Sequence, residues 1–349
     1  MPEPFPPDPA DDAWMALAIE EARKGLGLTS PNPAVGAVIV KNGEVIGKGW
    51  HRRAGEPHAE IEALRDANER SPNAVLGATI YVTLEPCSTH GRTPPCTEAI
   101  LAAGLARVVY GASDPNPGHC GRADDLLRAR GVQVASGVLQ KECEKLIQPF
   151  AKWITTGLPY VIAKAGLSLD GKITRPTGEP QWITSEQARA HAQTTRRQVD
   201  AILVGAETVR KDNPRLTLRG EQLPSDKKQP WRVVMTRSGN LPAEVHLFTD
   251  EFKDRTLVMT NQNLSEVLAD LGRRGVVSVL IEGGSQILSQ AFAQQLVDEV
   301  QWYFAPRICG GGLAVVSGLD LAKSIALKDV RTEVIGDNVC FIGRPEWES

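Results

Sequence analysis

The sequence predicts an α/β protein built from two domains, and three observations support this. Short β-branched runs alternate with segments of helical periodicity along most of the chain, which is typical of sheets covered by helices. The chain has 349 residues, enough for two domains at about 150 residues each. Hydrophobic residues make up 42% and charged residues 23%, which is the composition of an ordinary globular protein.

The first half predicts one sheet with helices on both faces. A helix begins after Asp11 and Asp12, either of which can cap it, and ends at Gly25. The Asn42-Gly43 turn then predicts a β-hairpin. Further helices are predicted at 58–70, 96–103, 122–130 and 140–155, and strands at 35–40, 44–50, 78–84, 106–111 and 132–135. This alternation predicts three layers, with the sheet in the middle.

A second α/β unit is predicted after Thr156-Gly157, where the last of these helices ends. Strands are predicted there at 160–167, 199–204, 231–235, 256–260, 276–281 and 298–304, and helices at 184–197, 264–273 and 284–295. The predicted organisation is a disordered tail over 1–11, a first domain over 12–156 and a second domain over 157–349.

Composition and charge exclude several classes of protein. Lys and Arg number 39 against 42 Asp and Glu, and aromatic residues are only 5%, so neither a basic groove nor a base-stacking surface is expected. No run approaches the roughly 18 apolar residues of a membrane span. Six cysteines are too few for a secreted disulfide scaffold, and the N-terminus lacks the regions of a signal peptide. We therefore expect a cytoplasmic enzyme that binds neither nucleic acid nor membranes.

Four residues of the first domain predict a catalytic zinc site. His58 opens a helix, and Cys87 and Cys96 follow a strand. A catalytic zinc needs three such ligands and one open position for water. Glu60, two residues after the histidine, can move the water's proton. The pattern H-x-E…P-C…C is the signature of zinc deaminases, with the glutamate as acid and base.

Other interpretations of the same residues remain open at this point. Free cysteines are more often small core residues than ligands. A histidine followed by a glutamate is also common at the start of an ordinary helix. A structural zinc would need a fourth ligand, which His90 could supply. The order and separation of the motif favour the catalytic site.

Longer motifs carry a resemblance to a known family. The runs PNPAVGAVIV, TLEPCSTHGRTPPC and DPNP resemble the bifunctional deaminase–reductase of riboflavin biosynthesis, from about residue 12 to 345. The wide spacing of Cys87 and Cys96 separates that family from cytidine and tRNA adenosine deaminases. The resemblance implies a cytidine-deaminase-like three-layer α/β/α domain followed by a dihydrofolate-reductase-like α/β domain.

The resemblance also implies roles in the first domain. There the family removes the 2-amino group of a 2,5-diamino-6-ribosylamino-pyrimidinone 5-phosphate by hydrolysis. Zn²⁺ would be held by His58, Cys87 and Cys96, with Glu60 as the catalytic acid and base. The substrate-binding residues implied are Asn32, His51, Arg92, Asp114 and Asn116. The chain departs from the family's pattern at Thr89, where a histidine is common, and over 118–123.

The second domain lacks the usual G-x-G-x-x-G fingerprint of dinucleotide binding. Instead, a strand ends at Glu282 and a Gly-Gly-Ser run opens a helix, whose free N–H groups suit a pyrophosphate. The run SLDGK at 168–172, together with GEPQWITS and VGAETVRKDNPRLTLR, resembles the reductase half of the same family, which reduces the ribosyl side chain with NADPH. The implied NADPH contacts are Gly166, Trp182, Thr208, Asp212, Gly283, Gly284 and Ser285. The implied substrate contacts are Lys164, Arg196, Leu216, Arg219 and Glu282.

Three hypotheses about function follow. The first is a zinc deaminase joined to an NADPH reductase, acting on small pyrimidine ribosyl phosphates and expected to form a homodimer or larger assembly. The second is a single-activity deaminase with a non-catalytic nucleotide-binding C-terminal domain. The third is a nucleic-acid-editing protein, which the charge balance disfavours.

Overall fold

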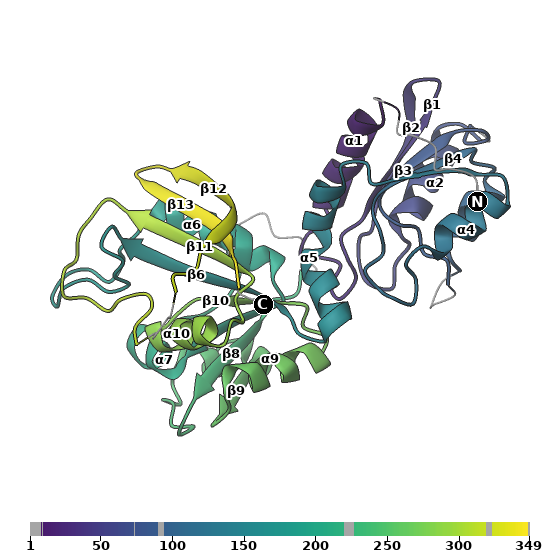
Figure 1. Ribbon diagram of the computed structural model, residues 1–349. Coiled ribbons are helices and arrows are strands. Elements are labelled where there is room, and N and C mark those ends of the chain that lie inside the picture. The colour runs from purple at the N-terminus through teal and green to yellow at the C-terminus, as the bar shows by residue number, and fades with distance from the viewer. Residues whose placement is uncertain are drawn as a thin grey trace. The chain divides into compact units, whose positions relative to one another are not determined.

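The computed structural model divides into two compact units, residues 1–157 and 158–349 (Figure 1). It describes residues 8, 10–72, 74–89, 94–219, 227–318 and 323–347. Gly157, in the left-handed conformation with φ 74°, ends the last helix of the first unit.

The first unit contains a five-stranded sheet in the order β2-β1-β3-β4-β5. Its strands are β1 (Gly36–Lys41), β2 (Glu44–Trp50), β3 (Thr79–Leu84), β4 (Arg107–Ala112) and β5 (Gln133–Ser136). The first three strands pair antiparallel, with the predicted hairpin at Asn42-Gly43, and β3, β4 and β5 run parallel. The strands form where β-branched apolar residues are concentrated, as the sequence predicts.

Helices cover both faces of this sheet. They are α1 (Asp11–Arg23), α2 (Ala59–Arg70), α3 (Cys96–Ala102), α4 (Arg122–Ala129) and α5 (Gln140–Thr156). One apolar core includes side chains of α2, α3 and α4, and a separate core includes side chains of α1 and α5. The three-layer prediction is confirmed.

The start of α1 differs from the sequence expectation by one residue. Asp11, placed at the end of the predicted tail, is the first residue of α1 and is fully buried. Arg107 donates to both of its carboxylate oxygens at 2.8 Å, and the Tyr81 hydroxyl donates at 2.9 Å. Burial alone would raise the pKa of Asp11, but these hydrogen bonds lower it. Arg107, which lies 96 positions further along the chain, therefore stabilises the start of α1. The spacing of residues in the sequence does not show this contact.

The second unit is built on a larger sheet with the order β12-β13-β11-β6-β10-β7-β8-β9 in the described residues. Its strands are β6 (Tyr160–Ser168), β7 (Ala201–Gly205), β8 (Trp231–Thr236), β9 (Thr256–Thr260), β10 (Ser278–Ile281), β11 (Glu299–Ala305), β12 (Leu327–Ile335) and β13 (Asn338–Pro345). From β11 to β9 the strands run parallel, and β13 and β12 extend the sheet antiparallel. The carboxyl ends of the parallel strands therefore lie at one edge, where ligands bind in such sheets.

The sequence predicts only some of the other elements of this unit. The helices are α6 (Glu186–Gln198), α7 (Ala206–Asp212), α8 (His246–Thr249), α9 (Leu264–Arg273) and α10 (Ser285–Ala293), with a 3₁₀ turn, η1, at Lys253–Arg255. The sequence predicts α6, α9 and α10 but misses α7, α8, β12 and β13. None of the helices in the described part of the chain is long and apolar enough to cross a membrane.

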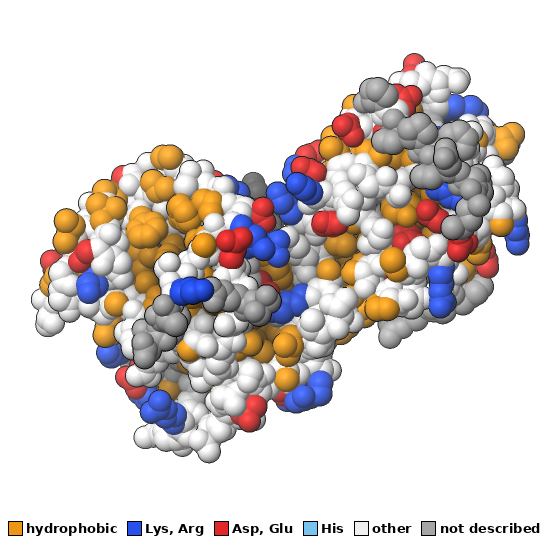
Figure 2. All heavy atoms as spheres, in the orientation of Figure 1, with side chains coloured by type: hydrophobic (Ala, Val, Ile, Leu, Met, Phe, Trp, Pro, Cys, Tyr) orange, Lys and Arg blue, Asp and Glu red, His pale blue; other side chains and the backbone are white. Residues whose placement is uncertain are grey.

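The exposure of the edge strand β12 explains why the sequence does not predict it. Most of its residues are exposed, so it lacks the apolar run that marks the buried strands. Figure 2 shows apolar side chains gathered on the surface around β12 and β13. They include Val334, which is 80% exposed, Val330 and Val339. A strand with this pattern is identified only through its pairing with β13.

Candidate active sites

Two helix starts carry predicted zinc ligands. His58 is the N-cap of α2 and Cys96 is the first residue of α3, while Cys87 lies in the loop after β3. Neither helix start has a side-chain cap. The start of α2 packs tightly on β2 because Gly49 has no side chain: a Cβ there would lie 2.3 Å from the Ala63 backbone nitrogen. This packing fixes where His58 stands.

The three predicted ligands lie together. His58 Nδ1 is 3.5 Å from Cys87 Sγ and 3.3 Å from Cys96 Sγ, and the three ligand atoms lie within 4.8 Å of one another. Hydrogen bonding from Cys96 and from His58 lowers the pKa of the Cys87 thiol to about 4, although burial acts in the opposite direction. A thiolate is the form that binds metal. One imidazole and two sulfurs match the donor set of a catalytic zinc with one open position, so the residues fit this metal.

Glu60 is buried beside these ligands. Only 3% of the residue is exposed, and its carboxyl group lies within hydrogen-bonding reach of Cys96. Burial raises the pKa of Glu60, and the neighbouring Cys87 raises it further. A carboxyl group of raised pKa can accept and return a proton near neutral pH. The position of Glu60 therefore suits acid–base chemistry next to the metal ligands.

Asn32 and His51 form a hydrogen-bonded pair next to His58. His51 Nδ1 is 3.0 Å from the Pro57 carbonyl oxygen, which can only accept, so Nδ1 carries the proton. His51 Nε2 then accepts from Asn32 Nδ2 at 3.1 Å. Burial lowers the pKa of His51, which favours its neutral form. The ring centroids of His51 and His58 are 5.3 Å apart, so the structure brings this pair to the predicted zinc site.

Asp114 and Asn116 lie in the loop between β4 and α4. Their side chains form consecutive turns, with Asn116 N donating to Asp114 Oδ1 at 2.9 Å and Gly118 N to Asn116 Oδ1 at 3.0 Å. Glu85, which the sequence motifs do not single out, anchors this loop. Its buried carboxylate accepts backbone N–H groups of the loop residues Asp114 and Gly121 and of Ala123 in the first turn of α4. Arg92, the remaining predicted substrate residue, lies outside the described residues.

The second unit contains a buried charge cluster. Arg196 Nε donates to Glu282 Oε1 at 2.7 Å, and a second hydrogen bond joins Arg196 Nη2 to Glu282 Oε2. Burial alone would raise the pKa of Glu282, but Arg196 and Lys164 lower it to about 2. Burial lowers the pKa of Lys164. Glu282 is therefore an anion at neutral pH and cannot serve as a proton donor.

The segment with Leu216 and Arg219 reaches the same cluster. Arg196 Nη1 donates to the Thr217 carbonyl oxygen at 3.2 Å. Leu216 is buried with φ 51°, in the left-handed region that non-glycine residues rarely adopt. Arg219 is exposed at the end of the segment. All five predicted substrate residues of this unit are thus connected to one site, either directly or through this segment.

Three predicted cofactor residues lie on or next to the loop between β6 and α6. Gly166 of β6 packs against Thr184, since a Cβ there would lie 3.0 Å from Thr184 Cγ2. Trp182 is 58% exposed, which is unusual for so large an aromatic side chain. Gln181 Nε2 donates to Asp212 Oδ1 at 2.7 Å. This hydrogen bond joins the Trp182 loop to the end of α7.

The start of α10 holds the other predicted cofactor residues. Gly284 is its N-cap, with φ 74° and no side-chain hydrogen bond, so the first N–H groups of the helix are not capped by a side chain. A Cβ at Gly283 or Gly284 would lie 3.6 Å from Thr208 Oγ1, which places Thr208 beside the turn. Ser285 Oγ is 3.0 Å from Ser317 Oγ. A glycine turn at a helix start fits a pyrophosphate, so the residues present suit a dinucleotide.

Comparison with family models matches both units. Residues 9–112 match the cytidine and deoxycytidylate deaminase zinc-binding region, and residues 159–341 match the RibD C-terminal domain. The riboflavin biosynthesis protein RibD of Escherichia coli is 39% identical over 365 residues, covering 95% of this chain and 98% of that protein. The chain belongs to the RibD family.

Other relatives extend along the same length. RibD of Bacillus amyloliquefaciens is 41% identical and covers 88% of both chains. The solved structure of Acinetobacter baumannii RibD has a TM-score of 0.88 at 35% identity and covers 97% of this chain and 99% of that one. The Thermotoga maritima diaminohydroxyphosphoribosylaminopyrimidine deaminase/5-amino-6-(5-phosphoribosylamino)uracil reductase has a TM-score of 0.87 at 36% identity, covering 96% and 99%.

Membership of the RibD family confirms the fold, enzyme class and function that the sequence predicts. The chain is a bifunctional deaminase and reductase of riboflavin biosynthesis, with a cytidine-deaminase-like unit followed by a dihydrofolate-reductase-like unit. Its zinc-binding region holds the His–Cys–Cys group. The reductase unit implies a nicotinamide cofactor, and the substrates of the family are pyrimidine ribosyl phosphates.

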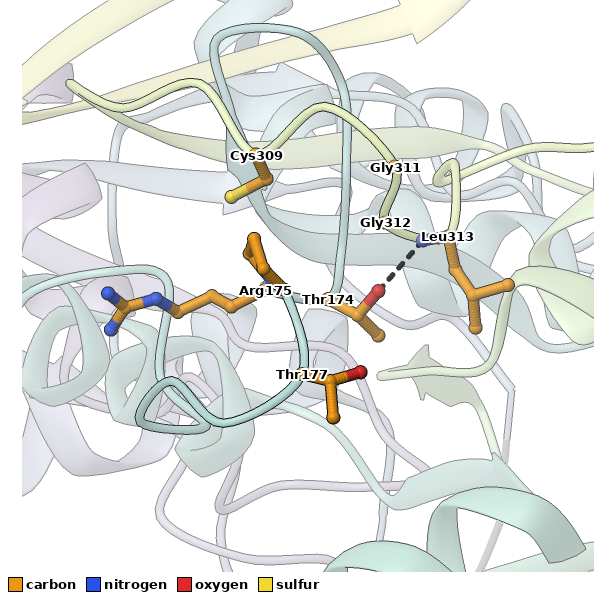
Figure 3. Close-up of a pocket in the computed structure, with 8 residues that line it drawn as sticks. Thr174, Arg175, Thr177, Cys309, Gly311, Gly312 and Leu313 are labelled. Atoms are coloured by element: carbon orange, nitrogen blue, oxygen red, sulfur yellow. Dashed lines mark hydrogen bonds between the residues drawn. The ribbon is translucent and has the colours of Figure 1, made fainter.

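The reductase unit also contains a separate pocket of about 290 Å³ (Figure 3). It is lined by Thr174, Arg175, Pro176, Thr177, Cys309, Gly311, Gly312 and Leu313. Thr174 Oγ1 accepts from Leu313 N at 2.8 Å across it, while the Arg175 guanidinium points away from the pocket. None of the predicted substrate or cofactor residues lines this pocket, so it is not the site described above.

Proposed function

We propose that this chain catalyses two successive steps with two separate sites. The first unit deaminates 2,5-diamino-6-(5-phosphoribosylamino)pyrimidin-4(3H)-one by hydrolysis. The second reduces the ribosyl side chain of the product with NADPH, which gives 5-amino-6-(5-phosphoribitylamino)uracil. The observation that supports the first step is the convergence of His58, Cys87 and Cys96 beside the buried Glu60.

In the first site, bound zinc would supply a Lewis acid that activates water for attack. His58, Cys87 and Cys96 would hold the metal. The Glu60 carboxylate takes one proton from the attacking water and delivers it to the pyrimidine ring nitrogen as the water oxygen bonds to C2. Glu60 then moves the remaining hydroxyl proton to the amine, and ammonia leaves as the C2–N bond breaks and the C2 carbonyl forms. Asn32 and neutral His51, together with Asp114 and Asn116, would orient the ring.

Glu60→Gln tests this assignment. The amide keeps the shape of the side chain but cannot accept the proton, so ammonia release should fall by about 10²–10⁴-fold. Zinc content, measured by elemental analysis, should be unchanged. NADPH oxidation with the deaminated product should also be unchanged, which controls for folding. Loss of zinc together with activity would contradict the acid–base role.

In the second site, NADPH would supply the hydride. Gly166, Trp182, Thr208, Asp212 and the Gly283–Ser285 turn would hold the cofactor. Lys164 and Arg196 provide positive charge that suits a phosphate ester, and Arg219 lies at the end of the adjoining segment. Because Glu282 is held as an anion by Arg196, we assign the proton for the ribose oxygen to Lys164 or water. Glu282 holds Arg196 in place through their two hydrogen bonds.

Binding of NADPH tests the proposed reductase site without a measurement of turnover. The intrinsic fluorescence of Trp182 should change on titration with NADPH, and Trp182→Phe should remove most of that change. A tenfold or greater preference for NADPH over NADH in Kd is expected. A protein that binds neither nucleotide, yet releases ammonia, would support the single-activity deaminase instead.

A further inference from the structure

The two places where the sequence departs from the family's pattern touch each other. Thr89 follows the zinc ligand Cys87, and His119 lies in the loop between β4 and α4, 30 residues later. Thr89 Oγ1 is 3.0 Å from His119 Nε2. His119 Nδ1 is 3.3 Å from Asp114 Oδ2. One imidazole therefore bridges the zinc-binding loop and a predicted substrate residue.

The loop that carries His119 is firmly held. The Glu85 carboxylate accepts backbone N–H groups on both sides of His119, from Asp114 at 3.2 Å and from Gly121 at 3.1 Å. The His119 backbone N–H donates to the Asn116 carbonyl oxygen at 2.9 Å. The side chain is thus presented from a fixed backbone, although about a third of it is exposed.

The two carboxylate oxygens of Asp114 have different hydrogen-bond partners. Oδ1 accepts from Asn116 N, which fixes that end of the carboxylate in the turn. Oδ2 faces His119, so the imidazole determines how the second oxygen is oriented. Because a carboxylate can only accept, His119 Nδ1 donates to it, while Nε2 hydrogen-bonds to the Thr89 hydroxyl, which can donate or accept.

We infer that His119 is a positioning residue of the deaminase site. It orients Asp114 towards the substrate and ties the β4–α4 loop to the loop that carries Cys87. The inference rests on the proposed deamination, with Asp114 as a substrate contact.

His119→Ala tests the inference in the zinc-loaded full-length protein. Loss of a hydrogen bond to a carboxylate should lower kcat/KM for ammonia release by about 10-fold, mainly through a higher KM. Zinc content and NADPH oxidation with the deaminated product should stay at the wild-type level. Cys120→Ala is the matched control, because this neighbouring side chain is exposed and should change neither parameter.

Rescue separates positioning from a general structural effect. Thr89→His in the His119→Ala background returns an imidazole to the same space and should recover most of the lost kcat/KM. Three results would each overturn the inference. They are a wild-type KM in His119→Ala, a loss of zinc in that variant, and no recovery when Thr89→His is added. Wild-type protein that releases no ammonia would instead refute the proposed function.

Discussion

The two units differ in how their described helices are capped. In the deaminase unit none of the helices α1 to α5 has a side-chain cap, and the starts of α2 and α3 carry His58 and Cys96. In the reductase unit, Ser185 caps α6, and Asn263 caps α9 in a full capping box with Glu266. Capping side chains stabilise a helix by about 1 kcal/mol each. The starts of α2 and α3, which carry the predicted metal ligands, lack this stabilisation, and so does the start of α10 in the reductase unit, where the predicted cofactor turn lies.

The two sites are assembled in different ways. The zinc residues lie within 39 positions, from His58 to Cys96, and two of them stand at helix starts. The reductase cluster joins Arg196 to Glu282, 86 positions apart, and it depends on the order of the strands in the sheet. The first site should therefore depend on its metal and the second on its buried ion pair.

The largest expected effect is at the zinc ligands. Removal of a group that hydrogen-bonds to a metal ligand weakens metal binding by roughly 10–100-fold, and Cys96→Ser, which changes a ligand itself, should weaken zinc binding by more than that. Ammonia release should be lost with the metal. The first unit should also unfold at lower temperature, because its helix starts lose the ion that holds them. Calorimetry and elemental analysis measure both effects. Cys120→Ser, an exposed cysteine in the same unit, is the control and should leave zinc unchanged.

In the second unit, the largest effect on the unfolding free energy is expected at the ion pair between Arg196 and Glu282. Arg196→Ala leaves the buried Glu282 carboxylate without its partner and should cost about 3–5 kcal/mol of the unfolding free energy. Chemical denaturation of the full chain measures it. The exposed pair of Arg273 and Asp270 provides the control, because Arg273→Ala should change stability by less than about 0.5 kcal/mol. Equal effects of the two substitutions would contradict the role of the cluster.

The Arg196–Glu282 pair should also make the unfolding free energy depend on pH. The folded-state pKa of Glu282 is about 2, below its ordinary value of 4.5. Its contribution to stability is therefore fully present above pH 4.5 and is lost as the pH falls through about 2. Glu282→Gln should show a shallower loss of unfolding free energy over this window. Parallel curves for the variant and the wild type would show that the carboxylate carries no such linkage.

The smallest effect is expected at a helix cap. Asn263→Ala should cost about 1 kcal/mol of unfolding free energy, because the Glu266 N–H loses its acceptor. The neighbouring exposed Gln262 provides the control, and its change to alanine should have almost no effect. If both substitutions behaved alike, the contrast between capped and uncapped helix starts would lose its support.

The sequence predicts the elements whose signal is local. Apolar β-branched runs mark the buried strands, and the zinc motif is readable because its residues are close together in the chain. The edge strand β12 is missed because it is mostly exposed. Glu85 and His119 are missed for another reason. The partners of Glu85 lie 29 to 38 positions away, and Thr89, one of the two partners of the His119 side chain, lies 30 positions away, in contacts that only the folded loop creates.

The central claim is that one chain holds two separable activities. Its most direct test gives the zinc-loaded protein the diamino substrate and NADPH, and follows ammonia and NADPH together. We predict one NADPH oxidised for each ammonia released. After removal of zinc by a chelator, both signals should stop, and adding the deaminated product should restore NADPH oxidation alone. NADPH oxidation that stays dependent on zinc with the deaminated product supplied would contradict the account.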